Sequence, residues 1–150
     1  MFEISKFKEE DKEQWKVLWA GYQSDEDASQ ERIDTEVIAN WPRLLNDNNC
    51  HCNALRLVES CKAIGFVTFV THWCTTSTKD ECCLYDLFVM PEFQGKGGGR
   101  LLINSVLTFA KENNLEEVSW LTRDNNKQAQ ILYNKITVGD PWIRYKVIIE

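Results

Sequence analysis

The feature that most constrains the fold is a glycine-dense stretch, Gln94 to Arg100, in which four of seven residues are glycine. It follows an apolar run that ends just before Pro91, and a helical spacing of apolar residues begins at Leu101. The order strand, glycine loop, helix start is typical of sites that bind a phosphate group. Glycines let main-chain N–H groups approach the anion, and the helix N-terminus adds its dipole. The stretch therefore predicts a phosphate-bearing ligand.

Two common kinds of glycine loop do not fit this stretch. A nucleoside-triphosphate loop needs Gly-Lys followed by Ser or Thr, whereas Lys96 is followed by Gly97. A dinucleotide loop needs G-x-G-x-x-G, and the third glycine is replaced by Arg100 in one register and by Leu102 in the other. A flexible surface turn is the remaining alternative, but loops with this many glycines seldom join a strand to a helix by accident.

Composition limits the class of protein. A chain of 150 residues with 43% hydrophobic and 27% charged residues is expected to form one domain, residues 1–150, with a proper core. A net charge of −6 argues against nonspecific nucleic-acid binding and is compatible with a cationic amine substrate. We found neither a membrane-spanning segment nor a signal peptide pattern, so a cytoplasmic protein without a membrane partner is expected.

The six cysteines do not form a recognisable metal site. No C-x-x-C pair occurs, and Cys50-His51-Cys52 lacks a second pair at zinc-finger spacing. We therefore expect no metal, and we expect reduced thiols, several of them buried as small apolar groups.

Apolar periodicity predicts the order β-α-α-β-β-β-α-β-α-β. Strands are expected at 2–7, 52–58, 63–71, 82–89, 117–122 and 142–149, and helices at 9–22, 29–45, 97–113 and 126–135. Pro42 is expected to kink or end the second helix. The order predicts a mixed α/β fold with an antiparallel front half and a parallel pair after the glycine loop.

The first helix carries an aromatic stripe of Trp15, Leu18, Trp19 and Tyr22, which we interpret as core packing. Tyr22 and the acidic residues 25–27 stand at the end of this helix, where a substrate cleft is expected to begin.

Two motifs together resemble a known family. Gln94-Gly95-x-Gly97-x-Gly99, with the strand before it and the Leu-Leu after it, resembles the acyl-coenzyme A loop of the GNAT superfamily of N-acetyltransferases. The later element Asn126-x-x-Ala129-x-x-Leu132-Tyr133 matches the family pattern that follows the last parallel strand. The resemblance implies a single-domain α/β fold with a mixed sheet of about six to seven strands and about four helices.

A closer resemblance extends over nearly the whole chain, to the fungal Hpa-type histone, polyamine and D-amino-acid acetyltransferases. It rests on the aromatic stripe of the first helix and on Phe69-x-x-His72, Thr75-Thr76, Asp86-Leu87-x-Val89 and Val118-x-Trp120-x-Thr122. The segment 135–141 departs from the family's usual Gly-Phe, which stands between the tyrosine helix and the last strand. Because that group exchanges its last strand between subunits, the resemblance implies a homodimer.

The resemblance implies acetyl-CoA as cofactor and assigns its binding residues. Leu87 and Val89 would pair with the pantetheine arm as an added strand, and the glycine loop would hold the pyrophosphate, with Lys96 or Arg100 adding charge. The implied residues are Leu87, Phe88, Val89, Gln94, Gly95, Lys96, Gly97, Gly98, Gly99, Arg100, Asn126 and Tyr133.

Four residues are candidates for the catalytic roles, and most of them have more than one possible role. The Val89 N–H is expected to stabilise the oxyanion. Tyr133 resembles the family's proton donor to the thiolate, although alone it reads as a buried tyrosine. Asp86, a carboxylate on an otherwise apolar strand face, is a candidate base, ammonium ligand or structural group. His72 is the other candidate base and, with Tyr22, a candidate substrate contact.

The leading function is therefore an acetyl-CoA-dependent N-acetyltransferase in which a primary amine of a small amine, polyamine or amino acid attacks the thioester in a ternary complex. The alternatives are acetylation of protein lysines, including histones, and a non-catalytic acyl-CoA-binding domain.

Overall fold

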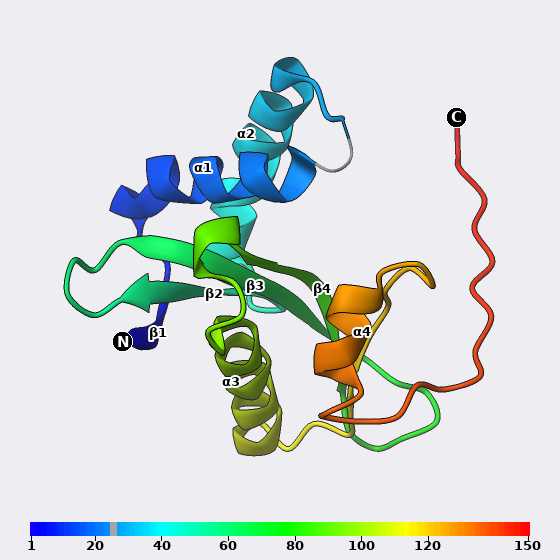
Figure 1. Cartoon of the computed structure of the whole chain (residues 1–150). Helices are drawn as coiled ribbons and strands as arrows, with labels where there is room; N and C mark the ends of the chain where they lie inside the picture. The colour runs from blue at the N-terminus through cyan, green and yellow to red at the C-terminus, as the bar shows by residue number, and fades with distance from the viewer. Residues whose placement is uncertain (25–26) are drawn as a thin grey trace.

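The computed structural model describes residues 1–24 and 27–150 and shows a single sheet flanked by helices (Figure 1). The strands are β1 (Phe2–Lys6), β2 (Cys50–Leu57), β3 (Ala63–His72), β4 (Glu81–Val89) and β5 (Val118–Trp120). The helices are η1 (Glu9–Asp11), α1 (Lys12–Gln23), α2 (Gln30–Asn46), η3 (Pro91–Phe93), α3 (Gly98–Glu112) and α4 (Lys127–Tyr133). The described strand order is β1-β2-β3-β4-β5, with β1 to β4 antiparallel and β5 parallel to β4. The α/β class is thus confirmed, with five described strands instead of six to seven.

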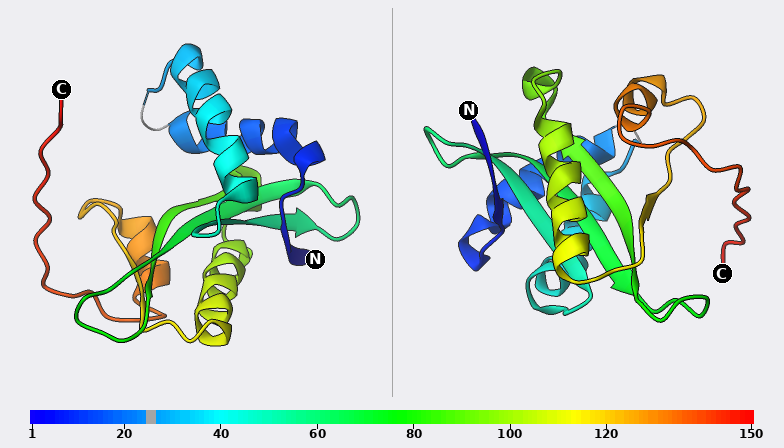
Figure 2. Two further views of the ribbon diagram at one scale, coloured as in Figure 1. Left: turned by 180° about the vertical axis from the view of Figure 1, so that it is seen from behind. Right: turned by 90° about the horizontal axis from the view of Figure 1, so that it is seen from below.

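The sheet separates two apolar cores, because successive side chains of a strand point to opposite faces. Trp15 of α1 and Trp41 of α2 pack with Phe66 of β3 on one face. Ile103 and Val106 of α3 pack against the other face. Figures 1 and 2 show α1 and α2 on one side of the sheet and α3 on the opposite side. The stripe on the first helix therefore serves core packing, although it also reaches the site described below.

Helix α2 continues past its proline. We expected Pro42 to kink or end this helix, but α2 runs on for one more turn to Asn46. The carbonyl of Pro42 accepts a hydrogen bond of 2.8 Å from Asn46 Nδ2, and Asp47 N–H closes the helix on Arg43 O at 2.9 Å. The last turn is therefore held by bonds that do not need the N–H that proline lacks.

The predicted C-terminal strand at 142–149 is wrong for this structure. Residues 137–150 carry no helix or strand, and they run apart from the sheet as the red segment in Figures 1 and 2. Their apolar side chains are exposed, Trp142 at 85% and Ile149 at 86%. The local pattern is that of a strand, but a strand needs a partner edge, and this segment has none within the described chain.

Strands β4 and β5 separate soon after they meet. They pair only from Cys82 to Leu84, which face Val118 to Trp120. Directly beyond, Tyr85 has no partner in β3, because Leu84 pairs with Phe69 and Asp86 with Thr68. Such a bulge increases the local twist of a strand. From Asp86 to Val89, β4 therefore has one edge that no described strand covers.

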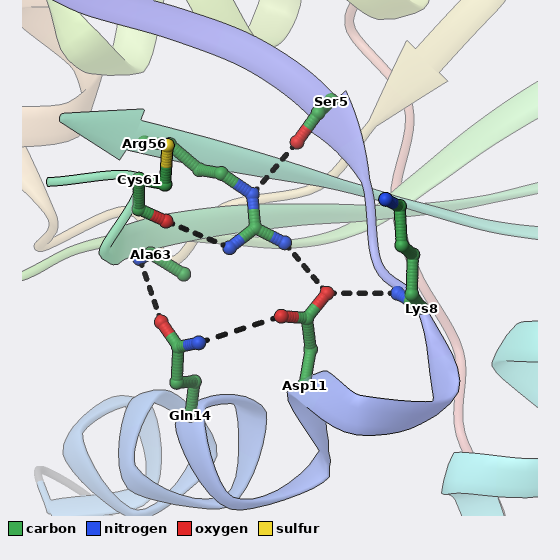
Figure 3. A network of polar contacts seen from close by, with 7 residues as sticks. All are labelled: Ser5, Lys8, Asp11, Gln14, Arg56, Cys61 and Ala63. Carbon is green, nitrogen blue, oxygen red and sulfur yellow. Dashed lines mark hydrogen bonds and ion pairs between the residues drawn. The ribbon is translucent and has the colours of Figure 1, made fainter. Parts of the chain in front are cut away.

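A buried ion pair fastens the beginning of α1 to the sheet (Figure 3). Arg56 Nη2 of β2 lies 2.7 Å from Asp11 Oδ2 of η1, and both side chains are about 90% buried. The other two guanidinium nitrogens donate to Ser5 Oγ at 2.8 Å and to Cys61 O at 3.0 Å. All three nitrogens of this buried guanidinium are therefore satisfied.

The carboxylate of Asp11 is equally well satisfied. It accepts hydrogen bonds from Lys8 N–H at 2.8 Å and from Gln14 Nε2 at 3.4 Å, and Gln14 Oε1 accepts from Ala63 N–H at 2.9 Å (Figure 3). The network joins β1, η1, α1, β2 and β3 at one end of the sheet. None of the helices in the described part of the chain is long and apolar enough to cross a membrane.

Candidate active site

A large cavity lies where β4 separates from β5. Its volume is about 1310 Å³, and its walls come from the ends of α1 and α2, the open half of β4, the glycine loop, the start of α3, and the segment from β5 through α4. Most of the predicted site residues line it: Tyr22, Asp86, Leu87, Phe88, Val89, Gln94, Gly95, Gly97, Gly98, Gly99, Arg100, Asn126 and Tyr133. Residues far apart in the sequence therefore meet in one cavity.

The glycine loop presents main-chain donors to this cavity. Gly95 and Gly97 have φ values of +73° and +88°, a backbone conformation that favours glycine. The first hydrogen bond of α3 runs from Leu101 N–H to Gly97 O at 3.1 Å. The three preceding N–H groups, of Gly98, Gly99 and Arg100, thus have no acceptor within the helix, and no described side chain caps this end. This is the arrangement that binds anions.

Two of the glycines pack closely against neighbouring elements. A Cβ on Gly98 would lie 2.5 Å from Leu55 Cδ2 of β2, and one on Gly99 would lie 3.2 Å from Leu132 Cδ2 of α4. These glycines let the start of α3 approach the sheet on one side and α4 on the other. The loop therefore sits at the junction of the elements that form the cavity.

The open edge of β4 directs main-chain groups into the cavity. Met90 N–H donates to Ile64 O of β3 at 2.9 Å. Because alternate residues of an antiparallel strand face the same neighbour, Leu87 and Val89 direct their N–H and C=O groups to the opposite, open edge. The side chain of Gln94 donates to Val89 O at 2.8 Å and closes the end of that edge. Leu87 and the Val89 N–H remain positioned to pair with an extended ligand.

Tyr133 enters the cavity from α4, with its ring edge-on to Trp120 of β5 at 5.5 Å between centroids. Burial raises the pKa of the Tyr133 phenol above its ordinary value, so the hydroxyl keeps its proton at neutral pH. Asn126 caps α4: its Oδ1 accepts from Ala129 N–H at 3.4 Å, and its Nδ2 donates to Thr122 Oγ1 at 3.1 Å. These contacts leave Asn126 on the cavity wall with a structural task.

Asp86 is the carboxylate that β4 contributes to the cavity. Burial raises its pKa above the ordinary value, while hydrogen bonds from Tyr22 and Thr68 act in the opposite direction and the negative charge of Glu36 adds to the rise. Tyr22 belongs to an aromatic group in which its ring lies 5.4 Å from Trp19 and 6.2 Å from Phe88. A carboxylate beside aromatic faces is chemically suited to hold an ammonium group.

Sequence reasoning missed a polar cluster centred on Glu36 of α2. Glu36 Oε2 accepts hydrogen bonds from Trp19 Nε1 at 2.8 Å and Gln23 Nε2 at 2.9 Å, and Oε1 accepts from Arg32 Nε at 2.8 Å. Burial by itself raises the pKa of Glu36, but these three donors outweigh it, and the pKa lies below its ordinary value. Arg32, Trp19 and Gln23 all line the cavity. The i, i+4 spacing of Arg32 and Glu36 was the one sequence signal for this cluster.

Two predicted residues are not brought to the cavity. The Lys96 ammonium donates to Glu92 O at 3.1 Å and lies over the Phe93 ring, outside the lining. His72 lies exposed at the end of β3, with Nδ1 3.2 Å from Trp73 O. Of the acidic residues expected at the mouth of the cleft, Asp25 and Glu26 lie outside the described residues, and Asp27 is exposed and not part of the lining.

Comparison with known proteins identifies the family. A model of the Acetyltransferase (GNAT) family matches residues 6–137. The D-amino-acid N-acetyltransferase HPA3 of Saccharomyces cerevisiae is 30% identical over 139 residues, which cover 91% of this chain and 84% of that protein. The crystal structure of ribosomal-protein-alanine N-acetyltransferase from Brucella melitensis biovar Abortus 2308 superposes with a TM-score of 0.83 at 18% identity, covering 99% of this chain and 100% of that one.

A further solved structure shares this fold. AAC(6')-Iy, solved in complex with the bisubstrate analog CoA-S-monomethyl-acetylneamine, superposes with a TM-score of 0.79 at 17% identity, covering 99% of both chains. At this identity the superposition shows the shared fold. The fold together with the family match thus defines an acyltransferase. More specifically, the chain belongs to the GNAT family: it is an N-acetyltransferase, and its cofactor is acetyl-CoA.

The residues present fit that cofactor. The free N–H groups at the start of α3 suit a pyrophosphate, and space is open where a Cβ would stand on Gly95 or Gly97. The edge of β4 at Leu87 offers an amide-bearing arm the hydrogen bonds of an added strand. Arg100 supplies a cationic side chain on the same wall.

Proposed function

We propose that the chain acetylates the primary amine of a small acceptor, which attacks acetyl-CoA directly while both are bound. The observation that carries this proposal is that Asp86 of β4 and Tyr133 of α4 line the same cavity, on the walls beside the open edge of β4. One group can hold and deprotonate an amine, and the other can protonate a leaving group. The glycine loop that suits the cofactor's phosphates lines the same cavity.

The residues divide the chemistry between them. Acetyl-CoA supplies the activated acetyl group as a thioester. Asp86 binds the acceptor ammonium and takes the proton that nitrogen must lose before it attacks. The Val89 N–H donates to the acetyl carbonyl oxygen as charge develops there. Tyr133 donates its proton to the sulfur as the C–S bond breaks. The ammonium thus gives one proton to Asp86. The nitrogen loses a second proton as the amide forms, and this proton restores the Tyr133 phenol, which has given its own proton to the thiol product.

A small acceptor is supported by the relatives and by the wall of the cavity. The yeast relative is named a D-amino-acid N-acetyltransferase. In this chain α1 closes the acceptor end with Trp19, Tyr22 and Gln23. A pocket walled by these three side chains suits a compact amine better than a long peptide.

The decisive experiment measures thiol release from acetyl-CoA in the presence of spermidine, D- and L-amino acids, and a histone-tail peptide, with the acetylated product identified by mass. We expect release to require an added small amine and the product to gain one acetyl group. Binding of coenzyme A without thiol release for any acceptor would sink the proposal in favour of a non-catalytic acyl-CoA-binding domain. If the histone-tail peptide is the preferred acceptor, the substrate is a protein lysine and the proposal of a small acceptor is wrong.

We also propose a homodimer in which the C-terminal segment of one copy adds to the sheet of the other. Strand β5 lies at the edge of the described sheet, and its outer side has no described strand partner. Residues 142–149 are rich in strand-forming side chains, and Trp142, Tyr145 and Ile149 are more than 80% exposed. An unpaired edge and an exposed strand-like segment of the same chain match each other.

This assembly is tested by placing a proline in the segment. We expect Val147→Pro to convert a dimer into a monomer in light scattering, because proline removes a ladder hydrogen bond. Val147→Thr keeps the strand propensity and should remain a dimer. A monomeric wild type, or a Val147→Pro dimer as strong as that of Val147→Thr, would contradict this mode of assembly.

A further inference from the structure

We propose that Arg32 selects acceptors that carry a carboxylate next to the amine, so that the cavity reads both ends of an α-amino acid. This inference rests on the proposed function, because it needs an acceptor amine at Asp86. It adds a residue whose part in acceptor choice follows from its position on α2 and from the contacts that hold it there.

Arg32 is held in place by one edge and leaves its other edge available. Its Nε donates to Glu36 Oε1 at 2.8 Å, and its side chain is 54% exposed on the cavity wall. The terminal nitrogens Nη1 and Nη2 have no hydrogen-bond partner among residues 1–24 and 27–150. These two nitrogens form the fork that binds a carboxylate with two parallel hydrogen bonds.

The anchor of Arg32 is itself rigid. Glu36 accepts from Trp19 and Gln23 of α1 as well as from Arg32, so one carboxylate ties the beginning of α2 to the end of α1. An arginine held in this way loses less side-chain freedom when it binds a ligand than a mobile surface arginine does. Arg32 is therefore a preorganised part of the wall.

The charges along the cavity favour an anionic group at this end. Among the described lining residues, Asp86 is the one carboxylate, and the cations are Arg32, Arg100, Arg123, Lys135 and Arg144. Arg100 lies at the start of α3, Arg123 lies between β5 and α4, and Lys135 and Arg144 follow α4. In the described lining, Arg32 is the cation that α1 and α2 contribute. An acceptor that carries positive charge and no carboxylate would place a second cation near the Arg32 guanidinium.

Contacts connect Arg32 to the amine position. Trp19 donates to Glu36 and its ring lies 5.4 Å from the Tyr22 ring, and both rings line the cavity together with Asp86. Arg32, Asp86 and the rings of Trp19 and Tyr22 thus line one cavity. An α-amino acid with an apolar side chain matches it, with its carboxylate at Arg32, its ammonium at Asp86 and its side chain against the rings.

The test compares acceptors that differ only at the carboxylate: phenylalanine in both enantiomers, its amide, and phenethylamine. The readout is the ratio of kcat/KM for the acid to kcat/KM for phenethylamine. Loss of a charge-assisted contact to a carboxylate predicts that this ratio falls by about 10- to 100-fold in Arg32→Gln. Arg32→Lys keeps the positive charge but not the two-pronged guanidinium, so its ratio should lie between those of wild type and Arg32→Gln.

Arg43→Gln is the matched control, because it makes the same change on the same helix outside the cavity lining, and the ratio should stay at the wild-type value. Equal melting temperatures and coenzyme A affinities for Arg32→Gln and Arg43→Gln would show that both variants are intact. If wild type prefers phenethylamine, the amide or spermidine to the acid, or if Arg32→Gln leaves the ratio unchanged, the inference is overturned while acetyl transfer itself stands. If no acceptor releases thiol, the proposed function fails first.

Discussion

Replacing Arg56 by methionine is expected to lower the free energy of unfolding by about 3–5 kcal/mol, because it leaves the Asp11 carboxylate buried without its cation. Asp11 and Arg56 are only 6% and 8% exposed, so water cannot easily take the place of the lost partner. The substitution also removes the donors to Ser5 and Cys61. For a chain of this length the melting temperature should fall by about 6–20 °C. Urea unfolding followed by tryptophan fluorescence measures the loss directly.

Two further variants separate the burial of the charge from the contact itself. In Asp11→Leu combined with Arg56→Met neither charge remains, and the combined loss should be smaller than that of Arg56→Met alone. Lys16→Met breaks the ion pair with Asp34, which is 2.9 Å long but 38–44% exposed, and should lower the free energy of unfolding far less than Arg56→Met does. If Arg56→Met and Lys16→Met lower the free energy of unfolding equally, then burial does not govern how much the Asp11–Arg56 pair contributes to stability.

The glycine loop was predictable because its function depends on local backbone geometry. Positive φ values at Gly95 and Gly97 and a helix that starts at Gly98 are properties of a short segment, and glycine spacing reports them directly. The same reason explains why the bounds of most helices and strands agree with the apolar periodicity. Asn126 as a helix cap is equally local.

Contacts between distant segments were not predictable in the same way. No spacing rule connects Trp19 to Glu36, since their bond depends on how α1 crosses α2. The segment 142–149 shows the opposite case: its pattern favours a strand, but pairing depends on an edge elsewhere, and the described chain offers it no partner. Lys96 was assigned to the cofactor by its place in the loop, yet its side chain turns to Glu92 O and the Phe93 ring.

Removing the hydroxyl of Tyr133 is expected to reduce kcat by about 100- to 10,000-fold, the range that a positioned proton donor contributes. Tyr133→Phe keeps the ring that packs edge-on against Trp120, so the fold and the cofactor site should be preserved. The loss should therefore appear in kcat for thiol release, with an unchanged dissociation constant for coenzyme A by calorimetry. Tyr85→Phe removes a phenol from the exposed side of β4, outside the cavity lining, and should keep wild-type kcat.

The pH dependence of Tyr133→Phe distinguishes proton donation from simple packing. Burial raises the pKa of Tyr133 above its ordinary value of 10.0, so the wild-type phenol remains a donor throughout the neutral and mildly alkaline range and loses its proton only at higher pH. Wild-type kcat should accordingly show no fall from this group below about pH 10, and the deficit of Tyr133→Phe should stay constant over that range. The group that titrates on the acid side is Asp86: its raised pKa predicts that activity falls as the pH drops through that value and the carboxylate is protonated. A kcat of Tyr133→Phe within about threefold of wild type would assign protonation of the thiol to water instead.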